Sequence, residues 1–404
     1  MKNSNLRKLA LAWGALMIAV ISSTVTLVVS GRMNSGVVDN LCWVTEAEYE
    51  TIQRYSRLDE VRQTMLRDYY RELDEDELVL GAIRGMTGSV DDPYTFYYTP
   101  DELKREQEDT AGVYYGIGTL LQNTAEGEIG IVRVFPGSPA EAAGLHVGDV
   151  IVAVDGDAVS GADGRSYLEA VRRMRGGEGT RVTLTVRRDG ERMAIPVTRG
   201  DVKISYASYR VLDGNIGYIS ISQFTGDAAQ VFHQAIEEFR LRGVSGLVID
   251  VRNNPGGLLD QAVSIADALL PKGVIVYTQQ RDGSRQDYTS DAEYFDVPLA
   301  VLVNDMSASA SEILAGSVQA LGRGVVVGLK TYGKGVVQSL QTFQSDGAGM
   351  QLTTSSYYDA LDRCPQGVGV QPDIEVALEG SGLPLEPDPE SDNQLAEAIR
   401  AIAK

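Results

Sequence analysis

Residues 301–338 read VLVNDMSASASEILAGSVQALGRGVVVGLKTYGKGVVQ, and this stretch decides the fold. It opens with an apolar run of strand length that is rich in β-branched residues, and the small-residue turn 307–311 follows. The spacing of the next apolar residues predicts a helix over 312–321, which a glycine ends. A second short strand at 325–327 leads to Lys334. The pattern predicts a turn that presents serines at a helix N-terminus, followed by a lysine between glycines.

Ser309 and Lys334 have the residue types of a nucleophile and its base. A serine hydroxyl is a weak nucleophile until a base takes its proton. Lysine can do so only when desolvation lowers its pKa, because the protonated amine has no lone pair. Gly333 and Gly335 leave no side chain to hydrate the amine, and the helix start beside Ser309 favours developing negative charge. From these residues alone a second interpretation stays open, in which SASASE is only an N-cap and Lys334 a surface lysine.

The run SASASEILAG and the downstream GKGVVQ resemble the active-site segment of the carboxyl-terminal processing proteases, Ser-Lys peptidases with a built-in PDZ domain. The resemblance extends over nearly everything after about residue 75. It implies Ser309 as the nucleophile, Lys334 as the base and Gln338 as the residue that orients the lysine. The implied fold is α/β and multidomain, with a crotonase/ClpP-like protease core, an inserted PDZ domain, a helical N-terminal region and a transmembrane helix.

Composition excludes several classes of function. The chain has 404 residues with 36 basic against 56 acidic ones, a net charge of −20, so it repels polyphosphates and nucleic acid is not an expected partner. The two histidines, His146 and His233, are too few for a His-rich zinc site, and no metal or cofactor is expected. Cys42 and Cys364 lack metal-binding spacing; one disulfide and two free thiols both stay open.

The N-terminus predicts a membrane anchor. Residues 9–29 carry no charge, and about 20 apolar residues at about 1.5 Å rise cross a hydrocarbon core of about 30 Å. Lys2, Arg7 and Lys8 precede this stretch and favour a cytoplasmic N-terminus. A cleavable signal peptide is the competing interpretation, but the apolar stretch is long for one and no clear cleavage site follows. We expect a single-pass cell-membrane protein whose catalytic region is extracytoplasmic.

Charged and apolar patterning divides the chain into segments. An amphipathic helix is expected within 45–75, packed on its own domain or on a second copy in a homodimer, and another over 74–90. A short helix is expected to start near Tyr97, and a C-terminal helix at 394–403 that packs on a partner subunit. The predicted domains are a cytoplasmic stub and anchor (1–35), a helical N-terminal region (36–111), a PDZ domain (112–199), the Ser-Lys protease core (200–376), and a linker with the C-terminal helix (377–404).

The second predicted domain contains a peptide-binding motif. GSPAEAAGLHVGDVIVAVDG, at 137–156, closely resembles a bacterial PDZ domain, which adds a peptide as an extra strand and captures its terminal carboxylate. The run Tyr115, Gly116, Ile117 and Gly118 resembles the carboxylate-binding loop, since glycine lets several N–H groups face one anion. Ile117 and Leu120 are expected to line an apolar pocket, which predicts protein substrates with apolar C-termini.

A second glycine-rich turn is a candidate oxyanion hole. The run SGLVIDVRNNPGG reads as a strand and a turn, in a region where strands alternate with helices and active sites lie at strand ends. Acyl transfer builds negative charge on the carbonyl oxygen, and each fixed N–H donor stabilises it by about 3 kcal/mol. The resemblance implies one donor at Gly256 or Gly257 and another at Ala310; a plain strand-to-helix turn is the alternative. Asp250 and Arg252 are interpreted as a structural pair outside the chemistry.

The sequence does not settle how Gln338 reaches Lys334. In a regular strand their Cα atoms lie about 13 Å apart, whereas in a helical turn they are neighbours. The expected function is a membrane-anchored serine endopeptidase with a Ser-Lys dyad that cleaves extracytoplasmic proteins recognised by their C-termini. A catalytically silent PDZ scaffold and acyl-thioester chemistry are the alternatives. The intact Ser309, Lys334 and Gln338 argue against the first, and the anchor and PDZ domain against the second.

Overall fold

The computed structural model describes residues 45–403, without 112, 125–126, 163, 204, 381–382 and 384–386. The chain divides into two compact units, one ending at Ile83 and one beginning at Arg84. None of the helices in the described part is long and apolar enough to cross a membrane. The predicted anchor at 9–29 lies outside the described residues, as does Cys42.

The first unit contains one long amphipathic helix, α2 (Glu46–Asp68), which Thr45 caps together with Glu48. The predicted helix within 45–75 is therefore present, but it ends at residue 68. None of its residues is buried. Its apolar stripe is solvent-exposed and comprises Tyr49, Ile52, Tyr55, Leu58, Val61 and Met65. The next helix, α3 (Glu75–Gly88), matches the expectation for 74–90.

A six-stranded sheet forms the centre of the second unit, in the order β10-β11-β12-β15-β16-β19. Its first strand is antiparallel to its neighbour and the other pairs are parallel. Parallel strands buried on both faces read as continuous apolar runs, as the central ones do here. The strands are β10 (Ala207–Leu212), β11 (Ile216–Ile221), β12 (Gly246–Asp250), β15 (Leu299–Val303), β16 (Val325–Gly328) and β19 (Ile374–Glu375).

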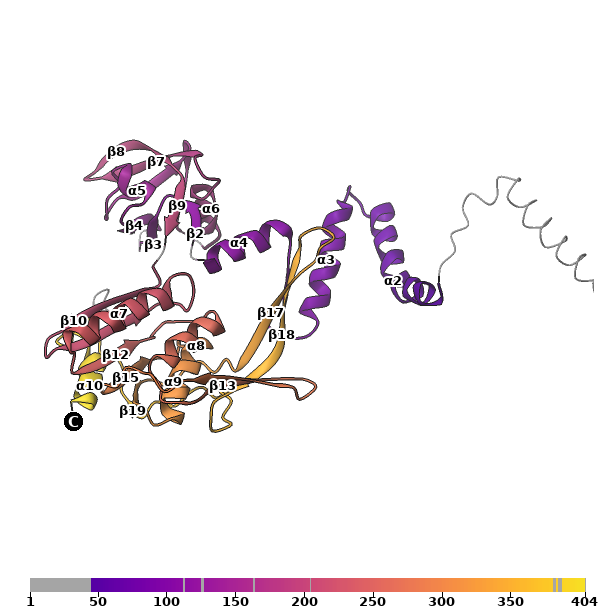
Figure 1. The fold of residues 1–404 in the computed structure, drawn as a ribbon. Coiled ribbons are helices and arrows are strands. Elements are labelled where there is room, and N and C mark those ends of the chain that lie inside the picture. The colour runs from indigo at the N-terminus through magenta and orange to yellow at the C-terminus, as the bar shows by residue number, and fades with distance from the viewer. Residues whose placement is uncertain are drawn as a thin grey trace, which may run out of the picture. The chain divides into compact units, whose positions relative to one another are not determined.

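Helices pack against both faces of this sheet (Figure 1). The larger apolar cluster includes side chains of α7 (Ala228–Arg242), α8 (Leu259–Asp267) and α9 (Ala310–Ala320). A smaller cluster contains α10 (Asn393–Ile402). The expectation that the C-terminal helix packs on a partner subunit is wrong, because its apolar side chains are buried against this chain's own sheet: Leu395, Ala398 and Ile402.

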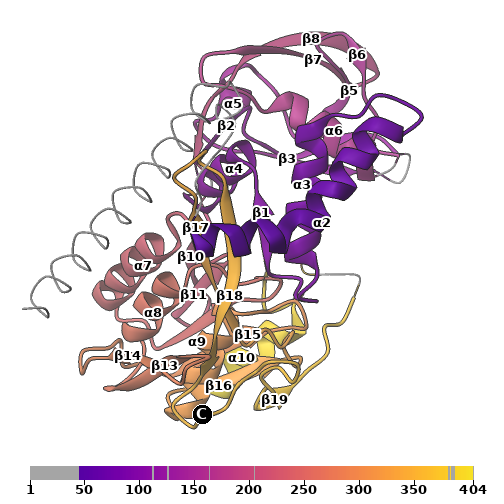
Figure 2. The same ribbon diagram turned by 90° about the vertical axis from the view of Figure 1, so that its right-hand side faces the viewer.

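A second, antiparallel sheet contains the long pair β17 and β18 (Figure 2). The helix expected near Tyr97 is wrong at its start, because these residues form β1, which pairs with β18, and α4 (Pro100–Ala111) begins after it. A prolyl residue at the first turn starts the helix there. The strands are β1 (Phe96–Tyr98), β13 (Gly273–Gln280), β14 (Arg285–Ser290), β17 (Val336–Thr342) and β18 (Gly349–Tyr358).

The PDZ region has its own sheet and its own apolar cluster. β2 (Val113–Gly116) and β9 (Gly200–Lys203) pair at its two ends, which brings entry and exit together as in an inserted domain. Its helices, α5 (Pro139–Ala142) and α6 (Gly164–Met174), lie where the sequence predicts them. Its sheet consists of β3 (Thr119–Asn123), β4 (Ile129–Val134), β5 (Val150–Val154), β6 (Asp157–Ala158), β7 (Arg181–Arg188) and β8 (Glu191–Thr198).

Candidate active site

Ser309 lies in a locked turn between β15 and the N-terminus of α9. Its φ of 54° is unusual for a residue with a side chain, and such strain persists only where the surroundings fix it. The two flanking serines supply that support: the Ser307 hydroxyl donates to Val251 O at 2.7 Å and the Ser311 hydroxyl to Asn254 O at 3.0 Å. Both flanking serines are fully buried. They therefore have structural roles, and Ser309 is the serine of the SASAS run that lines a cavity.

Lys334 lies in a loop just before β17, and its flanking glycines allow another loop to approach. A Cβ on Gly333 would lie 3.0 Å from Gly369 N, and one on Gly335 would lie 2.5 Å from Gln366 N. The φ of Gly333 is +95°, which also favours glycine. The close approach of backbone that the glycines permit is therefore present, with the loop at 366–369 as the neighbour.

One buried carboxylate links the two predicted catalytic residues. Glu312 Oε2 accepts the backbone N–H of Ser309 at 2.8 Å and that of Lys334 at 2.8 Å. The two nitrogens are therefore no farther apart than twice that distance. The other oxygen accepts the Thr331 hydroxyl at 2.5 Å and Gly333 N–H at 2.7 Å. Glu312 caps the helix, as the structural interpretation of SASASE expects, and the same bonds hold Ser309 and Lys334 together.

Tyr357 makes a second link between the same residues. Its hydroxyl lies 3.1 Å from Ser309 O and 2.8 Å from Lys334 O. The side chain is almost fully buried, and burial raises the pKa of Tyr357 well above its usual value. The phenol therefore stays protonated and can donate. Ser309 and Lys334 are thus connected at their N–H groups by Glu312 and at their carbonyls by Tyr357.

The surroundings of Lys334 lower the pKa of its amine. Burial lowers the pKa of the Lys334 amine, and the nearby carboxylates of Asp92 and Glu312 oppose that shift without reversing it. The amine lies 4.2 Å from the centre of the Tyr94 ring, which takes the place of water on that side and, as a cation–π contact, opposes part of the shift. Burial, followed by the hydrogen bond with Tyr332, raises the pKa of Tyr94 to about 12, so the ring stays uncharged. The direction of the lysine shift is the one that a general base requires.

Gln338 lies in β17, where the pairing with β18 shifts register between Val337 and Gln338. The segment is thus a loop and an irregular strand, neither the regular strand nor the helical turn that the sequence leaves open. The Gln338 amide donates to Thr353 Oγ1 at 3.0 Å. It lines the same cavity as Lys334. Its role in orienting the lysine stays a prediction.

The loop 254–257 borders the serine turn and offers backbone donors. A Cβ on Gly256 would lie 2.8 Å from Ser309 Cβ, so the two segments are in contact. Gly256 N–H already donates to Asn254 Oδ1 at 2.8 Å. Within the described part of the chain, no acceptor is found for the N–H of Gly257 or of Ala310. Because both residues line the cavity with Ser309, the geometry favours Gly257 over Gly256 as the second oxyanion donor.

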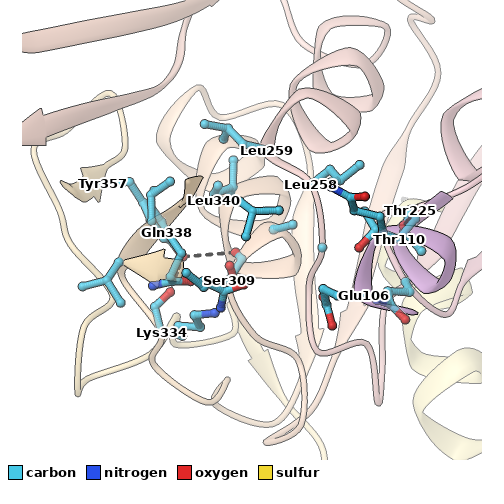
Figure 3. A pocket seen from close by; sticks show the side chains of 18 residues that line it. Glu106, Thr110, Thr225, Leu258, Leu259, Ser309, Lys334, Gln338, Leu340 and Tyr357 are labelled. Atoms are coloured by element: carbon cyan, nitrogen blue, oxygen red, sulfur yellow. Dashed lines mark hydrogen bonds between the residues drawn. The ribbon is translucent and has the colours of Figure 1, made fainter. Parts of the chain in front are cut away.

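Ser309, Ala310, Gly257, Lys334 and Gln338 border one cavity of about 560 Å³ (Figure 3). Apolar side chains cover part of its wall, among them Leu258, Leu259, Ile313 and Leu340. An apolar, concave site with a few convergent polar groups is the usual form of a substrate pocket. The structure therefore brings all the residues predicted for catalysis to one place.

Sequence reasoning missed the residues that surround the lysine. Asp92 and Tyr94 lie about 240 positions earlier, in the DDPYT turn, which the sequence marks only as a turn. Their place follows from the pairing of β1 with β18, a long-range contact without a local signal. His233 bonds Ser264 at 2.9 Å and does not line the cavity. Among the described residues no cluster of His, Cys, Asp and Glu is arranged for a metal ion.

The predicted peptide-binding residues lie just before β3, the edge strand of the PDZ sheet. Tyr115 and Gly116 belong to β2, and a small cavity of about 150 Å³ between β3 and α6 is lined by both Ile117 and Leu120. Tyr167 and Met174 of α6 border the same cavity. In the part of the chain that is described, the N–H groups of Ile117 and Gly118 have no acceptor. The loop thus has donors available beside an apolar pocket.

Comparisons with known proteins agree with this architecture. Residues 215–376 match the model of peptidase family S41, residues 130–188 that of the PDZ domain, and residues 27–101 that of the activating protease CtpB N-terminal domain. The carboxy-terminal processing protease CtpA of Bacillus subtilis (strain 168) is 32% identical over 375 residues, covering 92% of this chain and 78% of the relative. A carboxy-terminal-processing protease of Bartonella bacilliformis is 36% identical, covering 82% and 77%.

A solved structure is also similar along most of its length. The photosystem II D1 C-terminal processing protease shares 28% identity, with a TM-score of 0.51, covering 90% of this chain and 98% of that one. These relatives support a serine-type peptidase with an S41 protease fold and a PDZ domain. The chain belongs to the carboxy-terminal processing proteases of peptidase family S41.

Proposed function

We propose that this protease is a membrane-anchored, extracytoplasmic endopeptidase that works through a Ser309–Lys334 dyad. Neutral Lys334 takes the hydroxyl proton of Ser309, and the oxygen attacks the scissile carbonyl carbon. The N–H groups of Ala310 and Gly257 stabilise the oxyanion. The carbon–nitrogen bond then breaks as the lysine returns the proton to the leaving amine. Water attacks the acyl-enzyme with the lysine as base again, which releases the acid and restores Ser309.

One observation carries this mechanism: Glu312 Oε2 accepts the backbone N–H groups of both Ser309 and Lys334, and these two residues border the same cavity. A carboxylate used in this way fixes the distance between two chain segments rather than acting on substrate. Burial of the lysine supplies the second requirement, a lowered pKa.

Alanine variants test the dyad. The purified region after the anchor is incubated with an unfolded protein that ends in apolar residues, beside Ser309→Ala and Lys334→Ala. Lys330→Ala is the matched control, since Lys330 is an exposed lysine four positions upstream. Cleavage lost in both dyad variants and kept in the control supports the proposal. Cleavage that survives Lys334→Ala contradicts it.

Recognition of substrate C-termini through the PDZ domain is the second part of the proposal. Its support is the apolar cavity between β3 and α6 beside the N–H groups of Ile117 and Gly118. A cavity of about 150 Å³ has room for a benzene-sized group, so one apolar side chain fits with its carboxylate on the loop.

Cleavage of one substrate with a free and with an amidated C-terminus tests this recognition. Amidation removes the negative charge and leaves the apolar side chain in place, so KM is expected to rise for the amide. Competition by a short free-acid peptide, with its amide as control, measures the same contact without cleavage. Equal rates and equal competition for acid and amide would remove the PDZ loop from substrate selection.

The anchor and the extracytoplasmic location rest on the sequence of residues 2–29. Protease added outside intact cells is expected to remove the catalytic region, and membrane fractions should retain the uncleaved N-terminus by mass spectrometry. A catalytic region that is protected until the cells are lysed contradicts the proposed topology.

Homodimerisation is the remaining part, and the exposed stripe of α2 supports it. Large exposed apolar patches usually mark interaction surfaces. Leu58→Glu is expected to lower the mass measured by light scattering from dimer to monomer. A change on the polar side of α2, Arg57→Glu, is the control. A mass that is the same for both variants and the parent contradicts a dimer through this stripe.

A further inference from the structure

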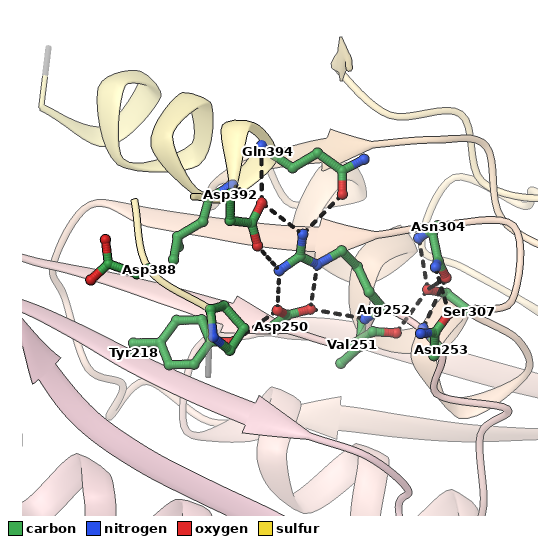
Figure 4. Close-up of polar contacts among 12 residues, drawn as sticks. Tyr218, Asp250, Val251, Arg252, Asn253, Asn304, Ser307, Asp388, Asp392 and Gln394 are labelled. Carbon is green, nitrogen blue, oxygen red and sulfur yellow. Dashed lines mark hydrogen bonds and ion pairs between the residues drawn. The ribbon is translucent and has the colours of Figure 1, made fainter. Parts of the chain in front are cut away.

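Arg252, at the end of β12, is bound by two carboxylates in the protein interior (Figure 4). Its guanidinium is fully buried. Nε donates to Asp250 Oδ1 at 2.9 Å and Nη2 to Asp250 Oδ2 at 2.5 Å. Nη2 and Nη1 donate to the two oxygens of Asp392 at 2.7 and 3.1 Å, and Nη1 also to Gln394 Oε1 at 2.9 Å. Bidentate arginine–carboxylate pairs fix orientation as well as distance.

Asp392 belongs to the C-terminal helix and has two tasks. It is the N-cap of α10, where one carboxylate oxygen accepts the N–H groups of Gln394 and Leu395. The same carboxylate binds Arg252 from outside the segment that matches the family model, which ends at residue 376. The residue is fully buried. Asp250 alone would neutralise Arg252, so charge balance does not explain the second carboxylate.

The contacts continue from Arg252 into the oxyanion loop. Asn253 has a φ of 58°, and its N–H donates to Asn304 Oδ1 at 2.9 Å. Fully buried Asn254 follows; it accepts Gly256 N–H on its side chain and Ala308 N–H on its carbonyl, at 2.8 and 3.0 Å. Residues 252–254 and 256 are held by these bonds. They therefore set the direction of the N–H group of Gly257, which follows them in the chain.

We propose that Asp392 is a positioning residue for the oxyanion hole, through Arg252 and the loop 253–257. An oxyanion donor must be placed to within about 0.5 Å of its productive position. If the loop 253–257 is held less firmly at Arg252, the cleavage rate should therefore fall before the fold is lost. The N-cap of the C-terminal helix thereby helps to position the oxyanion loop, whereas the apolar residues of the helix only pack on the sheet. This inference rests on the proposed mechanism, in which Gly257 supplies one donor.

Asp392→Asn tests the inference by removing one carboxylate from Arg252 while keeping an N-cap for α10. Asparagine is as good an N-cap as aspartate, and Arg252 keeps its pair with Asp250. The variant is expected to lower kcat about tenfold with KM changed less than twofold, because a weakened oxyanion donor acts only in the transition state. Asp392→Glu keeps the charge and should recover part of the loss.

A peptide boronic acid provides a readout that stability alone does not move. Its boron bonds to the serine oxygen and places a hydroxyl where the oxyanion forms, so its affinity should fall about tenfold in Asp392→Asn. Binding of a free-acid peptide to the PDZ domain should stay the same. The rising limb of the pH–kcat profile should also stay in place, because the lysine is untouched.

Ile402→Ala is the matched control. Ile402 lies at the other end of α10, where its Cδ1 would be 2.9 Å from a Cβ on Gly246, at the start of the same strand β12. The control should lower the melting temperature and leave kcat unchanged. Equal kcat and boronate affinity in Asp392→Asn and the parent would overturn the inference. Cleavage by the Ser309→Ala variant would instead refute the proposed mechanism. The two failures are therefore distinguishable.

Discussion

The two halves of the active site are built differently. On the serine side the residues around the nucleophile are buried in the core: Ser307, Ala310, Ser311 and Glu312 are at most 1% exposed. On the lysine side, β17 is half-buried at its start and exposed at its end, and Tyr332 is 60% exposed. The core therefore fixes the nucleophile, whereas a few polar links fix the lysine. Changes on the lysine side should alter rate and pH dependence without unfolding the protein.

Glu312→Ala should have the largest effect, because Glu312 joins the two halves. It removes the acceptor of four donors, including the N–H groups of Ser309 and Lys334. Each buried donor left unsatisfied costs about 1–3 kcal/mol, and a misplacement of about 1 Å costs about a hundredfold in rate. Loss of most activity together with a lower denaturation midpoint is expected, measured by cleavage assay and urea titration. If the variant folds stably and its activity is near that of the parent, Glu312 is not needed to hold Ser309 and Lys334 together.

Gly256→Ala tests the serine side alone. The new Cβ would lie 2.8 Å from Ser309 Cβ and 2.8 Å from Ala308 O, and the φ of Gly256 is +107°. Nucleophile and oxyanion loop must separate, so kcat should fall about a hundredfold with binding of free-acid peptides to the PDZ domain unchanged. Gly283→Ala, at an open turn with positive φ, is the control for backbone strain. Equal kcat in the two variants would show that the close packing of Gly256 against Ser309 is not needed for catalysis.

Gln338→Ala tests the lysine side. Gln338 bonds Thr353 across the β17–β18 pair and lines the cavity. If it restrains the lysine, kcat should fall about tenfold, whereas the melting temperature stays the same because the site is half-buried. Thr353→Val removes only the partner of this amide and should give a smaller loss in the same assay. A drop in stability without a drop in kcat would show that Gln338 stabilises the β17–β18 pair and does not act in the active site.

Asp92→Asn should shift the pH profile rather than the maximal rate. The Asp92 carboxylate raises the pKa of Lys334, against the larger effect of burial, which lowers it. Without this charge the pKa falls further and the amine is neutral at a lower pH. The rising limb of kcat/KM should therefore move to lower pH. A shift to higher pH would show that the carboxylate does not act on the base.

Lys334→Met should stabilise the fold slightly while abolishing activity. The half-buried amine has a lowered pKa, so the unfolded chain binds its proton more tightly than the native one. That penalty is present at neutral pH and disappears as pH rises towards the ordinary lysine value. The melting temperature of the variant should be about 2 °C higher at neutral pH, with the gain shrinking in alkaline buffer. A variant less stable than the parent at neutral pH contradicts a costly buried amine.

Much of the serine side can be predicted from the sequence because its signals are local. The strand, the small-residue turn and the helix lie within about 20 positions, and the structure has them as β15, the turn and α9. The choice between Gly256 and Gly257 was open, since it depends on which N–H the Asn254 side chain already holds.

The sequence also predicts Lys334 and Gln338, and its predicted Asp250–Arg252 pair is confirmed. The contacts of Lys334 with Tyr94 and of Arg252 with Asp392 depend on long-range packing and could not be predicted. Tyr94 reaches the lysine through β1, and Asp392 reaches Arg252 across 140 positions. The apolar pattern of the last helix was recognised, but a pattern of this kind does not say whether it covers its own sheet or another subunit.

The pKa of the Lys334 amine is the most direct test of the account. NMR of ¹³Cε-labelled lysine in Ser309→Ala measures it, with the Lys334 signal assigned by its absence in Ser309→Ala/Lys334→Met. Desolvation of the amine predicts a midpoint below the ordinary lysine value of about 10.4. A midpoint at or above that value would leave the amine protonated at working pH and contradict its role as the base.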